Sequence, residues 1–102
     1  MRKYETLLLL SPELSTDART PILEAFRNVI EREGGKVVAE DIWGMRDLAY
    51  PVRKHMRGFY VRYEYVSDNM GLVAEFERII RITDGVYKFI TVQLDDKVEE
   101  VA

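Results

Sequence analysis

The sequence predicts one α+β domain in which a four-stranded antiparallel sheet carries two helices on one face. Three observations predict this class. The length of 102 residues is that of one ordinary domain. Strand-like alternation and helix-like periodicity follow one another in the order strand, helix, strand, strand, helix, strand. A proline inside the second strand-like segment places that strand at a sheet edge.

Residues 2–10 form the first predicted strand. They begin by alternating and then become continuously apolar from Leu7 to Leu10. A run of this kind is typical of a strand in the middle of a sheet. Ser11 and Pro12 end the segment.

A helix is expected next, because apolar residues recur at helical spacing in Ile22, Phe26, Val29 and Ile30. Gly34 and Gly35 supply its C-terminal stop. Its start stays open, since a proline beyond the first turn removes a backbone hydrogen bond. A helix that begins near Thr16 would contain Pro21, whereas one that begins at Pro21, with Thr20 as its cap, would avoid that loss.

Residues 36–52 are the second predicted strand, placed at an edge by Pro51. Gly44 within it predicts a bulge or a bend. Residues 53–58 are expected to be the loop that turns the chain back. The next segment alternates between an apolar face and a face that is polar and aromatic, so the two segments predict a hairpin.

Ser67 or Asp68 is the expected N-cap of a second helix. Residues 83–85 then turn the chain, and residues 86–93 form the last strand. This order of elements predicts the ferredoxin-like βαββαβ arrangement with strand order 4-1-3-2. We expect the domain to span residues 1–94 and residues 95–102 to be a short acidic C-terminal tail. The apolar stripe of the second helix comprises Leu72, Val73, Phe76, Ile79 and Ile80.

Charge is distributed unevenly along the chain. The 15 basic and 18 acidic residues give a formal net charge of −3. The predicted tail holds four acidic residues and one lysine, so the rest of the chain is neutral. Residues 46–62 hold five basic residues and one acidic residue, interleaved with aromatic side chains. Such a local field attracts phosphate even on an acidic protein, although a solvated hairpin end would have the same composition.

The residue types needed for catalysis or metal binding are scarce. The chain has no cysteine, and His55 is its only histidine, placed in a polar turn. No glycine-rich phosphate loop is present, and the acidic pairs are adjacent, so in a strand they would point to opposite faces. The four leucines near the N-terminus are too few for a signal peptide or a membrane span. We expect no enzyme activity, metal, cofactor, small-molecule substrate or membrane partner.

Two other kinds of protein share the predicted order of elements. An acyl-phosphate hydrolase would need an arginine-bearing anion loop after the first strand, which has no counterpart here. An RNA-recognition motif stacks bases on aromatic residues of its third strand, and residues 57–63 open like its octamer. Tyr60 then stands where that motif requires a small residue, and Val61 comes one position early. A single-stranded RNA-binding module that uses the exposed sheet face stays the alternative.

Residues 44–54 read Gly-Met-Arg-Asp-Leu-Ala-Tyr-Pro-Val-Arg-Lys and closely resemble the signature of the bacterial small-subunit ribosomal protein six family. Residues 1–5, 57–60 and 80–88 resemble further segments of that family in the right order and spacing. The resemblance implies a structural component of the small ribosomal subunit in the cytoplasm. It also implies binding to the central domain of 16S rRNA, together with small-subunit ribosomal protein eighteen, and no binding to DNA.

The resemblance also supplies candidates for contact with rRNA or with the partner protein. Val52 replaces the usual isoleucine of the signature, and Lys88 stands where arginine is common, which makes a phosphate contact there less directional. Trp43 belongs either to the core or to an interface. The candidates are Arg2 and Lys3 in the first strand, Arg46, Tyr50, Arg53, Lys54 and Arg57 around the hairpin, and Arg81 and Lys88 near the last strand.

Overall fold

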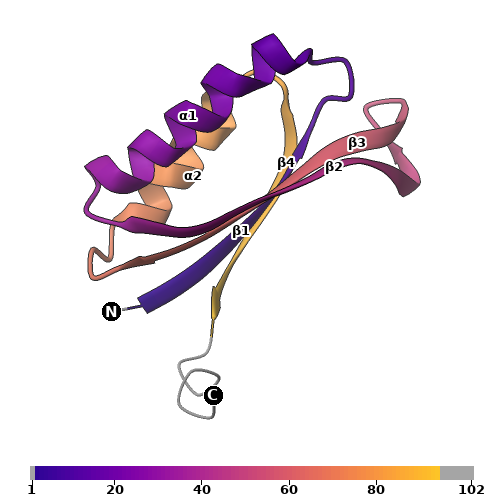
Figure 1. Cartoon of the computed structure of the whole chain (residues 1–102). Coiled ribbons are helices and arrows are strands. Elements are labelled where there is room, and N and C mark those ends of the chain that lie inside the picture. The colour runs from indigo at the N-terminus through magenta and orange to yellow at the C-terminus, as the bar shows by residue number, and fades with distance from the viewer. Residues whose placement is uncertain (1, 95–102) are drawn as a thin grey trace.

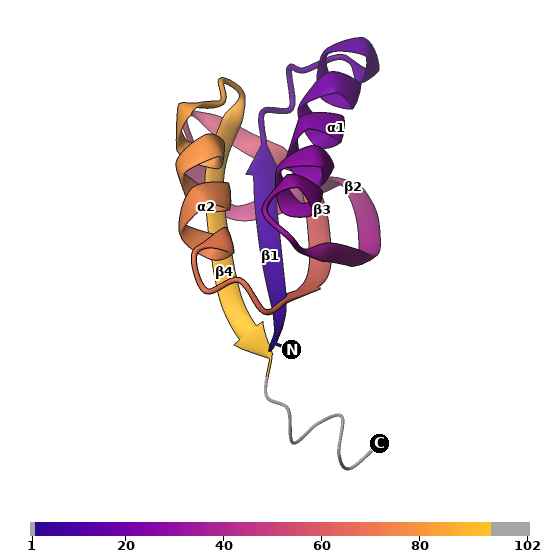
Figure 2. The same ribbon diagram turned by 90° about the vertical axis from the view of Figure 1, so that its left-hand side faces the viewer.

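The computed structural model describes residues 2–94, which form one four-stranded antiparallel sheet in the order β2-β3-β1-β4. Both helices lie on the same face of this sheet (Figures 1 and 2). The predicted ferredoxin-like arrangement and strand order are confirmed, whereas the predicted tail, 95–102, lies outside the described residues. The elements are β1 (Arg2–Leu10), α1 (Thr16–Arg32), β2 (Lys36–Val52), β3 (His55–Ser67), α2 (Leu72–Ile82) and β4 (Val86–Leu94).

The core lies between the two central strands and the helices. Alternate residues of β1 and β3 point toward the helices, and Leu8, Val61 and Tyr63 are fully buried there. Phe76 of α2 meets Phe26 of α1 edge to face, with ring centroids 5.7 Å apart. The continuous apolar run of β1 thus belongs to a central strand, as its pattern predicts.

Helix α1 begins at Thr16 and contains Pro21. Ser15 is its N-cap, and the Oγ of Ser15 accepts a hydrogen bond from the backbone N–H of Ala18 at 3.1 Å. The Ser15 cap, six residues before the proline, starts the helix, and burial of the apolar stripe compensates for the one backbone bond that a proline cannot donate. Of the two starts left open by the sequence, the earlier is therefore correct.

The expected N-cap of α2 is wrong, because neither Ser67 nor Asp68 caps this helix. Gly71 occupies the N-cap position and makes no side-chain cap bond. The Oγ of Ser67 instead accepts from the backbone N–H of Asn69 at 2.9 Å, and the Oδ1 of Asn69 accepts from the N–H of Gly71 at 2.9 Å. The polar side chains are used in two successive turns, which delays the helix until Leu72.

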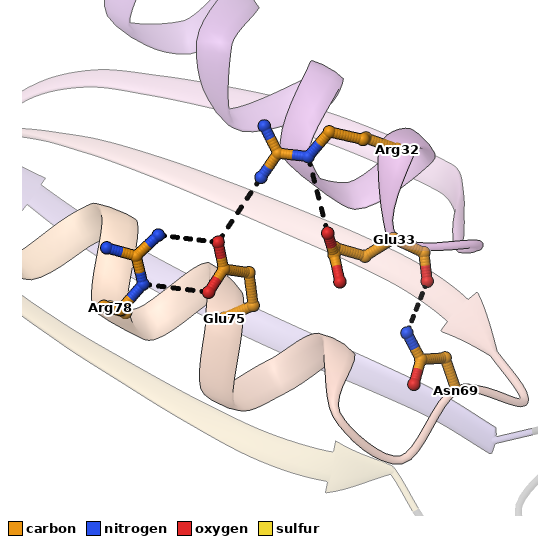
Figure 3. Close-up of polar contacts among 5 residues, drawn as sticks. All are labelled: Arg32, Glu33, Asn69, Glu75 and Arg78. Carbon is orange, nitrogen blue, oxygen red and sulfur yellow. Dashed lines mark hydrogen bonds and ion pairs between the residues drawn. The ribbon is translucent and has the colours of Figure 1, made fainter.

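A polar network joins the end of α1 to α2 (Figure 3). The Nδ2 of Asn69 donates to the carbonyl of Glu33 at 2.6 Å. Glu75 accepts from Arg78 at 2.9 and 2.8 Å and lies 3.4 Å from Arg32 of α1. Its bond with Arg78 holds the pKa of the Glu75 carboxyl below its ordinary value. These contacts lie on the helical layer and leave the opposite face of the sheet uncovered.

The turn between β2 and β3 is shorter than predicted. The expected loop over residues 53–58 is wrong, since β3 already begins at His55 and only Arg53 and Lys54 turn the chain. Their φ angles are 52° and 68°, the left-handed conformation that two-residue hairpins require. Asparagine and glycine are the usual residues in such turns, so two basic residues give no sequence signal for it.

Three register shifts interrupt the ladder of β2 with β3, the first between Val37 and Ala39 and two nearer the turn. The predicted bulge at Gly44 is confirmed, with φ of 84° and a register shift between Ile42 and Gly44. Farther along, Asp47 pairs with Arg57 and Val52 with His55, so residues 48–51 lie opposite a single residue of β3. Pro51 sits in this second bulge at the sheet edge, where no ladder bond is required of it.

Candidate RNA and protein interface

Five of the candidate residues, four of them basic, lie at the outer end of the β2–β3 hairpin, residues 46–57, which we call the hairpin tip. Arg46, Arg53, Lys54 and Arg57 are all exposed there. They reach this end because β2 and β3 extend beyond the last residue of β1, so no neighbouring strand covers them. The cluster of basic residues in the sequence is therefore also a cluster in space.

The contacts of Arg57 and Arg46 leave both available to a phosphate. The Nε of Arg57 lies 3.0 Å from Asp47, but the two side chains are 59% and 87% exposed. An ion pair that is this wet stabilises the fold little and exchanges readily for another anion. Arg46 donates to the carbonyl of Trp43 at 3.3 Å, and its guanidinium lies 5.9 Å from the Trp43 ring.

Trp43 lies on the surface and not in the core, which was one of the two positions that the sequence left open. Its side chain is 44% exposed, and its ring lies 6.1 Å from that of Tyr60. Val38 and Ile42 are also more than half exposed on β2. The edge strand thus presents exposed apolar side chains along its length, of which Trp43 lies nearest the hairpin tip, a combination that suits contact with another macromolecule.

Tyr50 and Lys88 meet across the sheet. The bulge at residues 48–51 brings Tyr50 toward β4, where the ammonium of Lys88 lies 5.1 Å from the centre of its ring. A groove of about 160 Å³ runs beneath this contact, and Leu9 and Tyr60 form part of its floor. Lys88, distant in sequence, is therefore part of the same basic end of the molecule.

Arg53 lies over Tyr87, which directly precedes Lys88 on β4. The guanidinium carbon is 5.2 Å from the centre of the ring. Tyr87 is absent from the predicted site residues. Nothing in an alternating strand pattern indicates that its side chain reaches the hairpin turn.

Arg81 stands apart from the hairpin tip. It lies in the last turn of α2, with its guanidinium 5.4 Å from the Phe89 ring and 3.6 Å from Glu77. Phe89 pairs with Leu8 and faces the helices, whereas Lys88 faces the uncovered side of the sheet. Arg81 and Lys88 thus lie on opposite sides of β4.

Arg2 and Lys3 lie at the other end of the sheet. Arg2 pairs with Ser67 at the end of β3, and Lys3 pairs with Leu94 at the end of β4. The ammonium of Lys3 is 3.6 Å from Glu64. The structure therefore divides the nine candidates into a main group at the hairpin tip and two separate positions.

On the uncovered face of the sheet, three carboxylates neutralise the charge of Arg62, one of the five basic residues of segment 46–62. Arg62 donates to Glu5 at 2.5 Å, to Asp41 at 2.7 Å and to Glu64 at 2.6 Å. These bonds raise the pKa of its guanidinium, and the bond to Glu64 is the largest cause. Although Arg62 adds to the positive charge of residues 46–62, its side chain is occupied and only 18% exposed.

Next to this ionic network the same face is apolar. A second groove, of about 220 Å³, is bounded by Leu7, Tyr60 and Ile90 among others. Ile90 is 60% exposed. Tyr60 is half-buried between the grooves, with its ring against Trp43.

Within residues 2–94, no group of three or more histidine, cysteine, aspartate or glutamate side chains is placed to hold a metal ion. No helix in this part of the chain is long and apolar enough to cross a membrane.

Comparison with known proteins identifies the family. Residues 3–93 match the family model of ribosomal protein S6. The chain is 66% identical over its whole length, and over the whole of the relative, to the small ribosomal subunit protein bS6 of Nitratidesulfovibrio vulgaris strain DSM 19637 / Miyazaki F. It is 66% identical, again with full coverage of both chains, to the protein of that name from Oleidesulfovibrio alaskensis.

A solved structure confirms the fold independently. The crystal structure of 30S ribosomal protein S6 from Thermotoga maritima superimposes with a TM-score of 0.88 at 24% identity. The match covers 98% of this chain and 94% of the other. The family model and the two full-length relatives show that the chain belongs to the ribosomal protein S6 family and is a structural, non-catalytic constituent of the small subunit of the cytoplasmic ribosome.

Proposed function

We propose that this protein binds the central domain of 16S rRNA together with small-subunit ribosomal protein eighteen, and that the hairpin tip supplies the main phosphate contacts. One observation carries the proposal. Four exposed basic residues and Lys88 gather at one end of a chain whose net charge is −3. A local positive surface on an acidic protein attracts phosphate at short range without promoting general RNA binding.

The mechanism is positional. Arginine and lysine side chains at the hairpin tip neutralise backbone phosphates and fix the orientation of the protein, but read little sequence. The edge of β2 offers Val38, Ile42 and Trp43 as apolar contacts for the partner protein. Because each surface is small, neither contact alone gives tight binding, and we expect RNA and partner to bind together.

A single-stranded RNA reader is the less favoured function. Such a module presents several aromatic side chains on the uncovered sheet face. Here the positions that follow Tyr60 on that face of β3 are Arg62 and Glu64, which are engaged in the ionic network. Among the residues described, Tyr60 and the neighbouring Trp43 offer ring surface here, and the exposed ring of Tyr50 is already contacted on one side by Lys88. That is a small platform for stacked bases.

Titration of a central-domain 16S rRNA fragment at several salt concentrations, with and without small-subunit ribosomal protein eighteen, tests the proposal. We expect detectable binding only with the partner, and a salt slope of about 0.7 to 0.9 for each phosphate contact. Arg53→Ala should weaken binding and lower that slope by about one contact. Arg32→Ala removes the same charge from an exposed arginine on α1 and is the matched control.

Two outcomes would contradict the proposal. Tight binding of the protein alone to unrelated RNA would show that the partner is not needed. A large loss with Tyr60→Ala, combined with no loss for Arg46→Ala or Arg53→Ala, would favour the single-stranded RNA reader.

A further inference from the structure

Tyr87 occupies a bulge at the start of β4. Leu9 of β1 pairs with Lys88, and Leu10 pairs with Val86, so Tyr87 is an extra residue with no partner in the ladder. A bulge of this kind releases a side chain from strict alternation and redirects it. The ring of Tyr87 accordingly lies against the β2–β3 turn, away from its strand neighbours.

Three segments of the chain meet at this ring. His55 stacks on it, with centroids 6.0 Å apart and planes inclined by 13°. Arg53 lies over it at 5.2 Å. The hydroxyl of Tyr87 lies 3.1 Å from the Oγ of Ser11, a buried residue whose backbone N–H donates to Gly85 at 2.7 Å. Tyr87 therefore ties the turn to β4 and to the end of β1.

The turn is one that needs such support. Arg53 and Lys54 both adopt the left-handed conformation, which is sterically unfavourable for a residue with a side chain. They also place two like charges next to each other. A strained conformation persists where the surrounding structure determines it, and the Tyr87 ring is the group that packs against this turn from β4.

We propose that Tyr87 is a positioning residue for RNA binding: its ring holds the β2–β3 turn against β4 and so presents Arg53 and Lys54 in one direction. The inference rests on the proposed function and adds a residue that contacts no phosphate itself. A basic side chain that is already oriented loses less freedom when it meets a phosphate. Lys88, the next residue, holds the other side of the hairpin through Tyr50.

The first test needs no RNA. Trypsin cleaves after Arg53 and Lys54 only when the turn can leave its folded conformation. Stacking and cation–π contacts of this kind stabilise by about 1 to 2 kcal/mol together, so Tyr87→Leu should speed cleavage at the turn roughly tenfold under native conditions. Tyr87→Phe keeps the ring and should be cleaved at nearly the wild-type rate. Cleavage after Arg32 and Arg78, measured in the same digests, controls for global unfolding.

The second test uses a double-mutant cycle on affinity for the central-domain fragment in the presence of the partner protein. Tyr87→Leu should weaken binding about three- to tenfold and lower the salt slope, whereas Tyr87→Phe should not. If Tyr87 acts through Arg53, then Arg53→Ala will have a smaller effect in the Tyr87→Leu background than in wild type.

The outcomes separate the inference from the proposed function. Equal effects of Arg53→Ala in both backgrounds, or unchanged cleavage at the turn in Tyr87→Leu, would overturn the inference and leave the function standing. If neither Arg53→Ala nor Lys54→Ala weakens RNA binding, the role of the hairpin tip in the proposed function fails. The RNA part of the inference fails with it, even if Tyr87→Leu loosens the turn.

Discussion

At the scale of single residues, charged side chains on the uncovered face stabilise the fold only as a set. Arg62 is surrounded by three carboxylates, and its side chain is 18% exposed. Removal of the guanidinium would leave those carboxylates facing one another without a cation between them. Loss of partners for charged, partly buried groups is more destabilising than loss of an exposed ion pair.

We therefore expect Arg62→Gln to lower the free energy of unfolding by about 1 to 3 kcal/mol, and more at low salt than at high salt. Urea denaturation at two ionic strengths measures this. Arg78→Gln removes an exposed arginine that pairs with Glu75 on α2 and should change stability little. An Arg62→Gln protein as stable as wild type at both ionic strengths would show that the network does not hold the strands together.

Two buried tyrosines make stability depend on alkaline pH. Burial raises the pKa of Tyr65 to about 12, against 10.0 for an exposed tyrosine. Burial and the hydrogen bond from Tyr63 to Glu40, at 2.5 Å, raise the pKa of Tyr63 as well. In each case the folded state keeps a proton that the unfolded chain loses. The stability contributed is fully present below pH 10 and is lost as the pH rises through 12.

The free energy of unfolding should fall between pH 10 and 12 by up to about 1.4 kcal/mol per pH unit for each buried tyrosine. Tyr65→Phe should reduce this slope by one proton, because the variant has no group to ionise at that position. Urea denaturation over this pH range provides the measurement, with Tyr50→Phe, at an exposed position, as the control. An unchanged slope in Tyr65→Phe would show that Tyr65 ionises equally in both states.

At the scale of elements, the β2–β3 turn sets stability against function. Lys54 has φ of 68°, which is the left-handed conformation and is unfavourable for lysine. A glycine adopts the same conformation at no steric cost. Lys54→Gly should raise the free energy of unfolding by about 0.5 to 1 kcal/mol, a gain limited by the greater freedom of glycine in the unfolded chain.

The same substitution removes a basic residue from the hairpin tip, so the more stable variant should bind the rRNA fragment less tightly. Thermal unfolding and the RNA titration, carried out on the same preparation, measure the two effects. Lys36→Gly, at the start of β2 and away from the tip, is a control for the loss of a lysine. A variant that is stabilised but binds with unchanged affinity would remove Lys54 from the candidate contacts.

The elements whose pattern reflects burial were predictable from the sequence. Three such patterns depend on how many sides of an element are covered: the leucine run of β1, the apolar stripe of α1 and the proline of β2. The structure confirms the central place of β1, the buried stripe of α1 and the edge position of β2. The helix cap predicted from local polar residues is wrong. Ser67 could cap a helix or close a turn, and the structure uses it in a turn because Asn69 offers a second one.

The site was predictable only in part, for a geometrical reason. The basic residues of the hairpin are neighbours in sequence, so a local cluster is visible before any fold is known. Tyr87 and Lys88 reach that cluster through a bulge in β4 and a bulge in β2, and neither shift in register leaves a mark in an alternating pattern. The neutralisation of Arg62 likewise depends on Glu5 and Asp41 from two other strands.

At the scale of the whole molecule, the net negative charge comes from the C-terminal end of the chain. Residues 95–102 carry a net charge of −3, equal to that of the entire protein. A chain that ends at Leu94 would be neutral, and it would approach RNA without the long-range repulsion of a net negative charge.

Deletion of residues 95–102 should therefore speed association with the rRNA fragment and partner protein at low salt. The difference should shrink as the Debye length falls to about 8 Å at physiological ionic strength. Stopped-flow association at three salt concentrations tests this, and substitution of the four acidic residues by their amides is a control that keeps the length. Equal rates at low salt would show that these charges do not reach the RNA.

The pairing of Lys3 with Leu94 has a practical consequence for experiments on this molecule. The first strand begins beside the point where the last strand ends, at the end of the sheet opposite the hairpin tip (Figure 1). A fluorophore, an affinity handle or a surface linker attached there is therefore separated from the basic residues of the hairpin tip by the length of the sheet. If the protein is immobilised on a sensor surface through this end, the hairpin tip faces the solution and stays accessible to ligands in a binding measurement.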